Sequence, residues 1–311
     1  MKNWKHIEGH LGSPAGFTGA AISAGIKKAE GALDLALIFS ESSRTSAAAV
    51  FTTNQAAAEP VKLSREHLKA SRGYARAVVV NSGNANACTG AQGRKAAVET
   101  ARAAARTLGI IKEQVMVAST GVIGVRLDFA RIISALPALK QNLSRENVST
   151  VGRAIMTTDT FAKCCALESK IGGKDVRLAG VAKGAGMIHP RMATMLSFIT
   201  TDARVAPNAL AKFLRAAVDV SFNRVSVDGD TSTNDTVLVL ANGASGVDVR
   251  TGSRIGAHFR AGLTWTTLGN DGPAVEKGGA AEALSRSIDS GATRNVYTYT
   301  GTQPLLSDAS N

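Results

Sequence analysis

Hydroxyl side chains beside glycines are the first feature of this sequence that suggests chemistry. In "STGVIG" (119–124), Thr120 and Gly121 directly follow an apolar run, so a hydroxyl and a backbone N–H can face the same anion. An oxyanion hole needs such donors. In "GMIHPRMATMLSF" (186–198), Thr194 stands just before the apolar pair Met-Leu. Taken alone, Thr194 is more typical of a β-branched residue on a half-buried strand.

Three further segments gather small polar residues and one cation. "NSGNANACTG" (81–90) and "MTTDT" (156–160) are rich in Asn, Ser and Thr, which favour turns that expose backbone N–H groups. "AKGAGM" (182–187) places Lys183 beside a glycine-bent backbone. Each segment alone is also typical of a surface loop, and a lysine is ordinarily exposed.

Two segments resemble metal-binding motifs but lack residues that those motifs require. "DGDTSTND" (228–235) opens like a calcium loop, but its sixth position is Thr233 rather than Gly and its twelfth is Val239 rather than Glu. "HIEGH" (6–10) lacks the order of a zinc-binding HExxH helix. Neither motif therefore predicts a metal site.

Composition indicates a globular chain. It has 311 residues, 44% of them hydrophobic, enough for one large or two medium domains. No apolar run is long enough for a membrane span, and the N-terminus has no apolar core of a secretory signal. The three cysteines form neither a disulfide framework nor a metal spacing, which favours a reducing cytoplasm.

The net charge of +12 raises the question of a nucleic-acid partner. The basic residues are spread along the chain, no run of five Lys or Arg occurs, and only 5% of residues are aromatic. A base-stacking surface is therefore not expected. A basic surface that attracts small anionic substrates explains the charge as well.

Alternating strand and helix patterns must position these segments. Apolar β-rich runs predict strands at 33–39, 47–52, 75–81, 114–119 and 235–241. Helical periodicity predicts helices at 91–109, 127–143 and 207–223. This alternation predicts an α/β fold.

Together, the five segments resemble the ornithine acetyltransferase family, the glutamate N-acetyltransferases of arginine biosynthesis, in order and approximate spacing. The resemblance covers about residues 11–248. It implies layered sheets flanked by helices, an aminopeptidase-like architecture, with the nucleophile at a strand start between two sheets.

The resemblance also implies self-cleavage between Ala193 and Thr194. The chain would become an alpha-chain-like segment, 1–193, and a beta-chain-like segment, 194–311, which assemble into a hetero-oligomer. Thr194 would take acetyl from N-acetylornithine and pass it to glutamate. The resemblance implies no metal, no separate cofactor, and no nucleic-acid or membrane partner.

The resemblance assigns roles to four more residues. Thr120 and Gly121 would bind the oxyanion, and Thr157 and Lys183 would contact the substrate, with Lys183 as the cation for its carboxylate. Acetyl-CoA serves as a second donor in bifunctional members, and the sequence leaves open whether it does so here.

The chain departs from the family pattern in two places. Arg191 stands where Asn is usual. After about residue 250 the similarity is lost: the family's "DGEGATK" is replaced by "NDGPAVEKGG" (270–279), with Pro273 in place of the substrate-binding Glu and Glu276 as the nearest carboxylate. This predicts a truncated or frameshifted C-terminal part.

Three alternatives remain open from the sequence. A related threonine-nucleophile hydrolase or aminopeptidase would pass the acyl group to water. A catalytically defective relative would fold and cleave without transferring acetyl. A basic nucleic-acid-binding or scaffold protein would have no activity and would bind DNA in a salt-dependent way.

Overall fold

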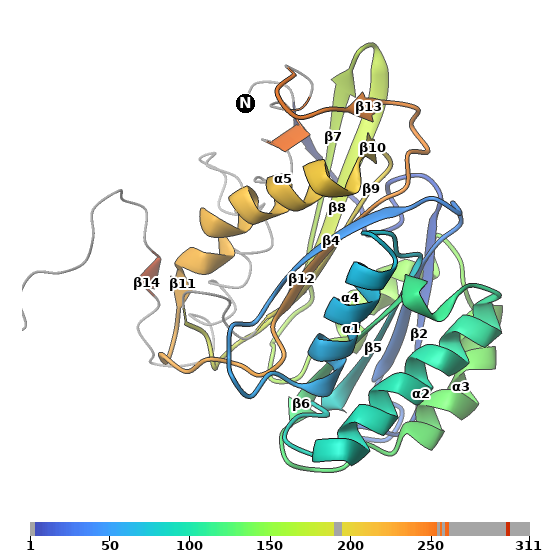
Figure 1. Ribbon diagram of the computed structural model, residues 1–311, viewed down its shortest axis with the longest axis vertical. Helices are drawn as coiled ribbons and strands as arrows, with labels where there is room; N and C mark the ends of the chain where they lie inside the picture. The colour runs from blue at the N-terminus through green and yellow to red at the C-terminus, as the bar shows by residue number, and fades with distance from the viewer. Residues whose placement is uncertain (1–3, 190–194, 254–255, 257–258, 261–296, 299–311) are drawn as a thin grey trace, which may run out of the picture.

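The computed structural model describes residues 4–189, 195–253, 256, 259–260 and 297–298. Two β-sheets lie face to face (Figure 1). The larger sheet has the order β1 (Lys5–Ile7), β7 (Lys163–Ile171), β8 (Lys174–Lys183), β9 (Leu196–Thr201), β12 (Thr236–Ala241) and β4 (Ser46–Phe51). The smaller sheet has the order β2 (Phe17–Ile22), β3 (Leu35–Ser40), β5 (Ala77–Asn84) and β6 (Val115–Val122).

An apolar core fills the space between the sheets. Strand β3 contributes Ala36 and Ile38 to it, while β12 contributes Leu238 and Leu240 from the opposite sheet. Successive side chains of a strand point to opposite faces, so the intervening residues of β3 and β12 pack outward into two further cores. Both strands are therefore apolar without interruption, because both of their faces are buried.

Helices cover the outer face of each sheet (Figure 1). Helices α1 (Glu59–Ala70), α2 (Gly90–Leu108) and α3 (Phe129–Gln141) pack on the smaller sheet, and α5 (Pro207–Asp219) packs on the larger one. The short helix α4 (Val151–Ala154) contributes to the core between the sheets. The result is a four-layer arrangement, so the predicted α/β fold with layered sheets flanked by helices is confirmed.

All five predicted strands and all three predicted helices are present. The strands are β3, β4, β5, β6 and β12, and the helices are α2, α3 and α5. Pro207 begins α5, where its missing N–H costs nothing. Gly109 ends α2 in the left-handed conformation that glycine adopts readily.

The hairpin of β7 and β8 was not predicted. Its strands mix charged residues with Ala and Gly, so neither forms a long apolar run. The signal was the two-residue turn Gly172–Gly173, because both glycines have positive φ and join paired strands directly. Strands β2 and β9 and helix α1 were also missed.

Short elements complete the described chain. Strand β10 (Arg204–Val205) pairs with β13 (Asp248–Val249), and β11 (Val225–Ser226) pairs with β14 (Tyr297–Thr298). Three 3₁₀ helices span Lys112–Gln114, Asn147–Thr150 and Phe222–Arg224. Within the described residues, no helix is long and apolar enough to span a membrane.

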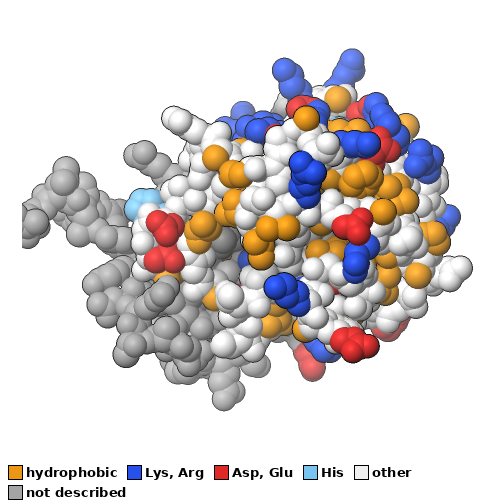
Figure 2. All heavy atoms as spheres, turned by 90° about the horizontal axis from the view of Figure 1, so that it is seen from below, with side chains coloured by type: hydrophobic (Ala, Val, Ile, Leu, Met, Phe, Trp, Pro, Cys, Tyr) orange, Lys and Arg blue, Asp and Glu red, His pale blue; other side chains and the backbone are white. Residues whose placement is uncertain are grey.

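One face of the molecule shows how its charge is distributed. In Figure 2, Lys and Arg side chains lie among apolar and uncharged groups, with single acidic residues between them. This face therefore carries scattered positive charge and not a continuous basic surface.

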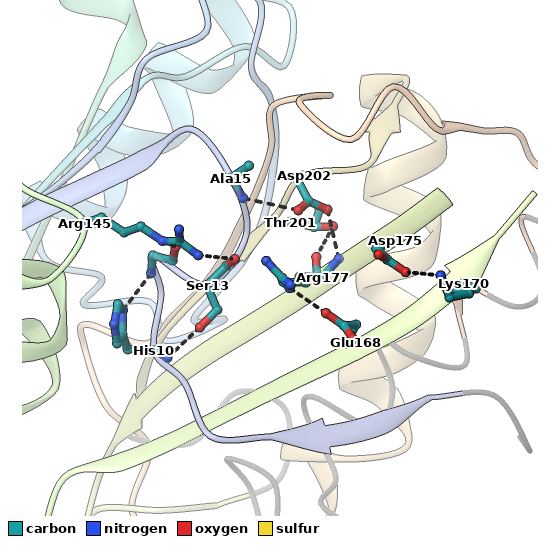
Figure 3. Close-up of polar contacts among 11 residues, drawn as sticks. His10, Ser13, Ala15, Arg145, Glu168, Lys170, Asp175, Arg177, Thr201 and Asp202 are labelled. Atoms are coloured by element: carbon teal, nitrogen blue, oxygen red, sulfur yellow. Dashed lines mark hydrogen bonds and ion pairs between the residues drawn. The ribbon is translucent and has the colours of Figure 1, made fainter. Parts of the chain in front are cut away.

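The chain segments before and after residues 190–194 build the same sheet. Strands β9 and β12 lie between β8 and β4, which come from the first segment. At the far end of β9, Asp202 accepts hydrogen bonds from the backbone N–H groups of Ala15, at 3.2 Å, and Arg177, at 2.9 Å (Figure 3). The Thr201 hydroxyl donates to the Arg177 carbonyl at 2.8 Å. The two segments are therefore held together by a shared sheet and by polar contacts at its end.

Candidate active site

Lys183 and Thr120 meet between the two sheets. Lys183 is the last residue of β8, and Thr120 lies near the end of β6. The Lys183 Nζ atom donates a hydrogen bond to the Thr120 hydroxyl at 2.8 Å, and both residues are buried. Lys183 is only 3% exposed, which rules out a solvated surface lysine.

This contact shapes the electrostatics of both groups. Burial lowers the pKa of the Lys183 ammonium to about 8, although the nearby Asp159 carboxylate opposes the shift. Because Lys183 occupies an acceptor site on the Thr120 oxygen, the hydroxyl hydrogen of Thr120 is directed away from the ammonium. Thr120 is therefore oriented as a donor toward another group.

Gly121 allows strands β5 and β6 to approach closely. It pairs with Gly83, and its φ of 130° lies in the region that favours glycine. A Cβ atom added to Gly121 would lie 2.3 Å from the carbonyl carbon of Gly83. The segments "NSGNANACTG" and "STGVIG" are thus in direct contact, as their roles in one site require.

A buried ion pair supports the turn that follows Lys183. The carboxylate of Asp159 contacts the Lys163 ammonium and accepts a hydrogen bond from the Gly184 N–H at 2.7 Å. The other carboxylate oxygen accepts from the Thr157 N–H at 3.2 Å. Burial alone would raise the pKa of Asp159, but Lys163, Lys183 and the Gly184 N–H together outweigh it and the pKa is lowered.

Thr157 is placed near the site through this ion pair. Its backbone joins Asp159, whose carboxylate also holds the residue after Lys183. The Thr157 side chain is exposed. The structure therefore links Thr157 to the turn after Lys183 through Asp159. Among the described hydrogen bonds, none joins the side chains of Thr157 and Lys183.

Both backbone polar groups of Met195 are hydrogen-bonded. Its N–H donates to the Asp235 carboxyl at 2.8 Å, and its carbonyl accepts from the Thr236 N–H at 3.0 Å. Strand β9 begins one residue later. Thr194, Ala193 and Arg191 lie outside the described residues, so Met195 is the covalent neighbour that locates the start of this strand.

Asn234 joins the remaining segments. Its amide nitrogen donates to the carbonyl of Ala85 at 2.7 Å and to that of Ser119 at 2.8 Å. Thus "DGDTSTND" contacts both "NSGNANACTG" and the strand that leads to Thr120. Sequence reasoning assigned no role to Asn234, Asp235 or Asp159, although each stands in a segment singled out for its polar residues.

A basic cleft opens beside this site. It has a volume of about 670 Å³ and includes Gly83 and Asn84 in its wall. Four cations line it, namely Lys27, Lys28, Arg126 and Arg131, with the single carboxylate of Asp128. This local excess of positive charge attracts anions.

The fold and the site together define a four-layer α/β protein with polar strand ends gathered between its sheets. The chain belongs to the ArgJ family, whose model matches residues 18–268. The match extends 20 residues beyond the expected limit at 248.

Relatives and solved structures agree with this assignment. An arginine biosynthesis bifunctional protein ArgJ from a Synechococcus species is 52% identical over 242 residues, which cover 78% of this chain and 58% of that relative. The crystal structure of ArgJ from Bacillus halodurans has a TM-score of 0.57 at 36% identity and covers 62% of this chain and 98% of that one.

The crystal structure of ornithine acetyltransferase complexed with ornithine from Mycobacterium tuberculosis is also similar. It has a TM-score of 0.55 at 36% identity, over 62% of this chain and all of that one. The present chain spans 58% of the length of its Synechococcus relative. Pro273 and Glu276 lie outside the described residues, so the altered C-terminal part stays a prediction, as does the absence of a cofactor.

Proposed function

We propose that this chain is an acyltransferase that moves acetyl from N-acetylornithine to glutamate through an acyl-Thr194 intermediate. The hydrogen bond from buried Lys183 to Thr120 carries the proposal, because it orients a hydroxyl donor between the sheets. Family membership supports the reaction class, and ornithine in the Mycobacterium tuberculosis structure supports the substrate class.

The nucleophile would be generated by self-cleavage. The Thr194 hydroxyl attacks the Ala193 carbonyl carbon, and the acyl group shifts from nitrogen to oxygen. This shift breaks the peptide bond and frees the Thr194 amine, and water then hydrolyses the ester, which frees the Ala193 carboxylate and restores the Thr194 hydroxyl. An α-amine has an unperturbed pKa of about 7.7–8.0, which suits a base acting on its own hydroxyl near neutral pH.

Transfer would then follow in two steps. The Thr194 oxygen attacks the acetyl carbonyl of N-acetylornithine and ornithine leaves with a proton. The glutamate amine next attacks the acetyl-threonine ester and restores the hydroxyl. In both tetrahedral intermediates the Thr120 hydroxyl and the Gly121 N–H would donate to the oxyanion.

Lys183 would act on both Thr120 and the substrate. Its ammonium is bound to Thr120, and its remaining N–H groups provide the cation that an amino-acid carboxylate requires. The basic cleft beside Gly83 would raise the local concentration of such anions. Thr157, with its exposed side chain, would contact the substrate at the edge of the site.

The two products of cleavage would stay associated. Strands β9 and β12 of the second piece are enclosed by β8 and β4 of the first, which makes the pieces a heterodimer that can assemble further. A cytoplasmic location stays a prediction.

An acetyl-transfer assay tests the proposal. Purified protein is supplied with acetyl-labelled N-acetylornithine, with and without glutamate, and labelled N-acetylglutamate and acetate are measured. Acetylglutamate that forms only with glutamate supports the transferase. Acetate formed at the same rate without glutamate favours the hydrolase, and neither product indicates a catalytically defective relative.

Acetyl-CoA is tested as a donor in a parallel reaction. The curated Synechococcus relative is described as bifunctional. Acetylglutamate formed from acetyl-CoA without N-acetylornithine would extend the proposal to both donors, whereas formation from N-acetylornithine alone would restrict it to one.

A further inference from the structure

Two adjacent residues at the start of β12 contact both strands that carry the proposed chemistry. Asn234 reaches the ends of β5 and β6 in the smaller sheet. Asp235 reaches Met195, which immediately precedes β9 in the larger sheet. One dipeptide therefore bridges the strand of the oxyanion donors and the strand of the nucleophile.

The Asn234 side chain is fully engaged. Its two N–H donors have two carbonyl acceptors, from Ala85 and Ser119, and its amide oxygen accepts from the Thr233 hydroxyl at 2.6 Å. Ala85 directly follows β5, and Ser119 directly precedes Thr120. A buried amide with all of these bonds made has one orientation, so it fixes the separation of the groups it joins.

Asp235 contacts the other strand through a hydrogen bond to its Oδ1 atom. The residue is 1% exposed, and its Oδ1 atom accepts from the Met195 N–H. The Met195 nitrogen is covalently bonded to the carbonyl carbon of Thr194, at about 1.33 Å. Asp235 therefore holds the nitrogen of the peptide bond that follows residue 194.

Apolar packing alone would not set this geometry. The core between the sheets is made of aliphatic side chains, whose attraction is non-directional. Hydrogen bonds depend steeply on distance and angle. The Asn234 and Asp235 bonds add direction at the point where the two sheets must be in register for catalysis.

We propose that Asn234 and Asp235 are a pair of positioning residues that set the separation between the proposed oxyanion donors, Thr120 and Gly121, and the Met195 nitrogen before β9. This rests on the proposed function of Thr194. Their loss would slow self-cleavage and acetyl transfer more than it lowers stability, because a misplacement of about 1 Å can cost about 10² in rate.

A matched pair of variants tests Asn234. Asn242 directly follows the same strand, is equally buried at 7%, and also donates its amide to a backbone carbonyl, that of Ala15 at 2.7 Å. Asn234→Asp and Asn242→Asp each replace donors by acceptors. Refolded precursor is followed by intact mass, and Tm is measured for both variants.

We expect Asn234→Asp to slow cleavage at least ~10-fold at a temperature well below its Tm. Asn242→Asp should lower Tm by a comparable amount and cleave within about twofold of wild type, since energetic coupling is largely confined to residues in contact. Cleavage of Asn234→Asp at the wild-type rate would overturn the role of Asn234.

Conservative replacement tests Asp235. Asp235→Asn retains an oxygen acceptor for the Met195 N–H, whereas Asp235→Ala removes it. The asparagine variant should cleave at a rate near wild type and the alanine variant should not. Equal rates in the two variants would overturn the role of the Met195 hydrogen bond.

Amide hydrogen exchange separates this inference from the proposed function. A wild-type precursor that stays uncleaved would count against the proposed role of Thr194. In that case, amide exchange rates still test the positioning role of Asn234 and Asp235. Asp235→Ala should speed exchange at Met195, and Asn234→Asp should speed it at Ala85, whose N–H donates to the Val122 carbonyl at 2.9 Å. Amides of β3 serve as the unchanged reference. Wild-type exchange at Met195 and Ala85 in these variants would contradict the positioning role.

Discussion

The Lys183 ammonium and the Thr120 hydroxyl meet across two sheets, with 2.8 Å between Nζ and Oγ1. The two residues are 63 positions apart in the sequence, so the contact is produced by the tertiary fold. The contact turns an ordinary strand-end threonine into an oriented donor. Burial lowers the pKa of Lys183 to about 8, so the ammonium remains mostly charged at neutral pH.

Removing the Thr120 hydroxyl should lower the rates of both cleavage and transfer. We expect Thr120→Ala to reduce them by about 10²–10³, with a smaller change in KM, because the donor acts on the transition state. Thr120→Ser keeps the hydroxyl and should retain most activity. Cleavage rates, kcat and KM measure the effect, and wild-type rates in Thr120→Ala would remove Thr120 from the site.

A methyl group at Gly121 should separate the ends of β5 and β6. The added Cβ would clash with Gly83 at 2.3 Å, whereas Gly124, also at positive φ, has no atom within 4 Å of an added Cβ. Each Gly→Ala change incurs backbone strain of about 1–3 kcal/mol. We therefore expect Gly121→Ala to lower Tm further than Gly124→Ala and to slow cleavage. Equal Tm values would show that the close approach has no energetic consequence.

Features formed by residues close together in the sequence could be predicted from it, whereas contacts between distant residues could not. Strands with both faces buried, such as β3 and β12, are largely continuous apolar runs. Helix α2 ends at Gly109, a common helix terminator. The contacts of Asn234 span 149 and 115 residues. Such contacts depend on how two sheets stack, which local periodicity does not encode.

The ion pair of Asp159 and Lys163 shows the same limit at short range. The residues are four apart, a spacing that favours a pair on a helix. Here Asp159 lies in the irregular segment before β7 and Lys163 begins that strand, so the tertiary fold and not a helix brings them together. Buried pairs of this kind become visible only after the fold is known.

Breaking this ion pair should be strongly destabilising. We expect Asp159→Asn to lower the free energy of unfolding by about 3–5 kcal/mol, because Lys163 is left as a buried, uncompensated charge. Asp175→Asn breaks an exposed pair with Lys170 and should cost at most about 1 kcal/mol. Urea denaturation of both variants measures the difference, and similar losses would contradict the assigned burial.

Stability should depend on pH through Asp235. Burial raises the pKa of its carboxyl to about 8 from an ordinary value of 3.8. The folded state therefore binds this proton more tightly than the unfolded state, and stability is lost as the pH rises from about 4 through 8. Asp235→Asn has no such proton, so its Tm relative to wild type should rise between pH 5 and 8. A pH-independent difference would contradict the raised pKa.

The most direct test of the proposed mechanism is the fate of the bond between residues 193 and 194. Wild-type protein should convert from 32.1 kDa into pieces of 193 and 118 residues, and the smaller should begin Thr-Met-Leu-Ser-Phe. Thr194→Ala should remain a single 32.1 kDa chain, because one hydroxyl serves both cleavage and transfer. Intact mass and N-terminal sequencing of the two proteins show whether this bond is cleaved in each. Splitting of Thr194→Ala at the same bond would contradict the assignment of Thr194 as the nucleophile.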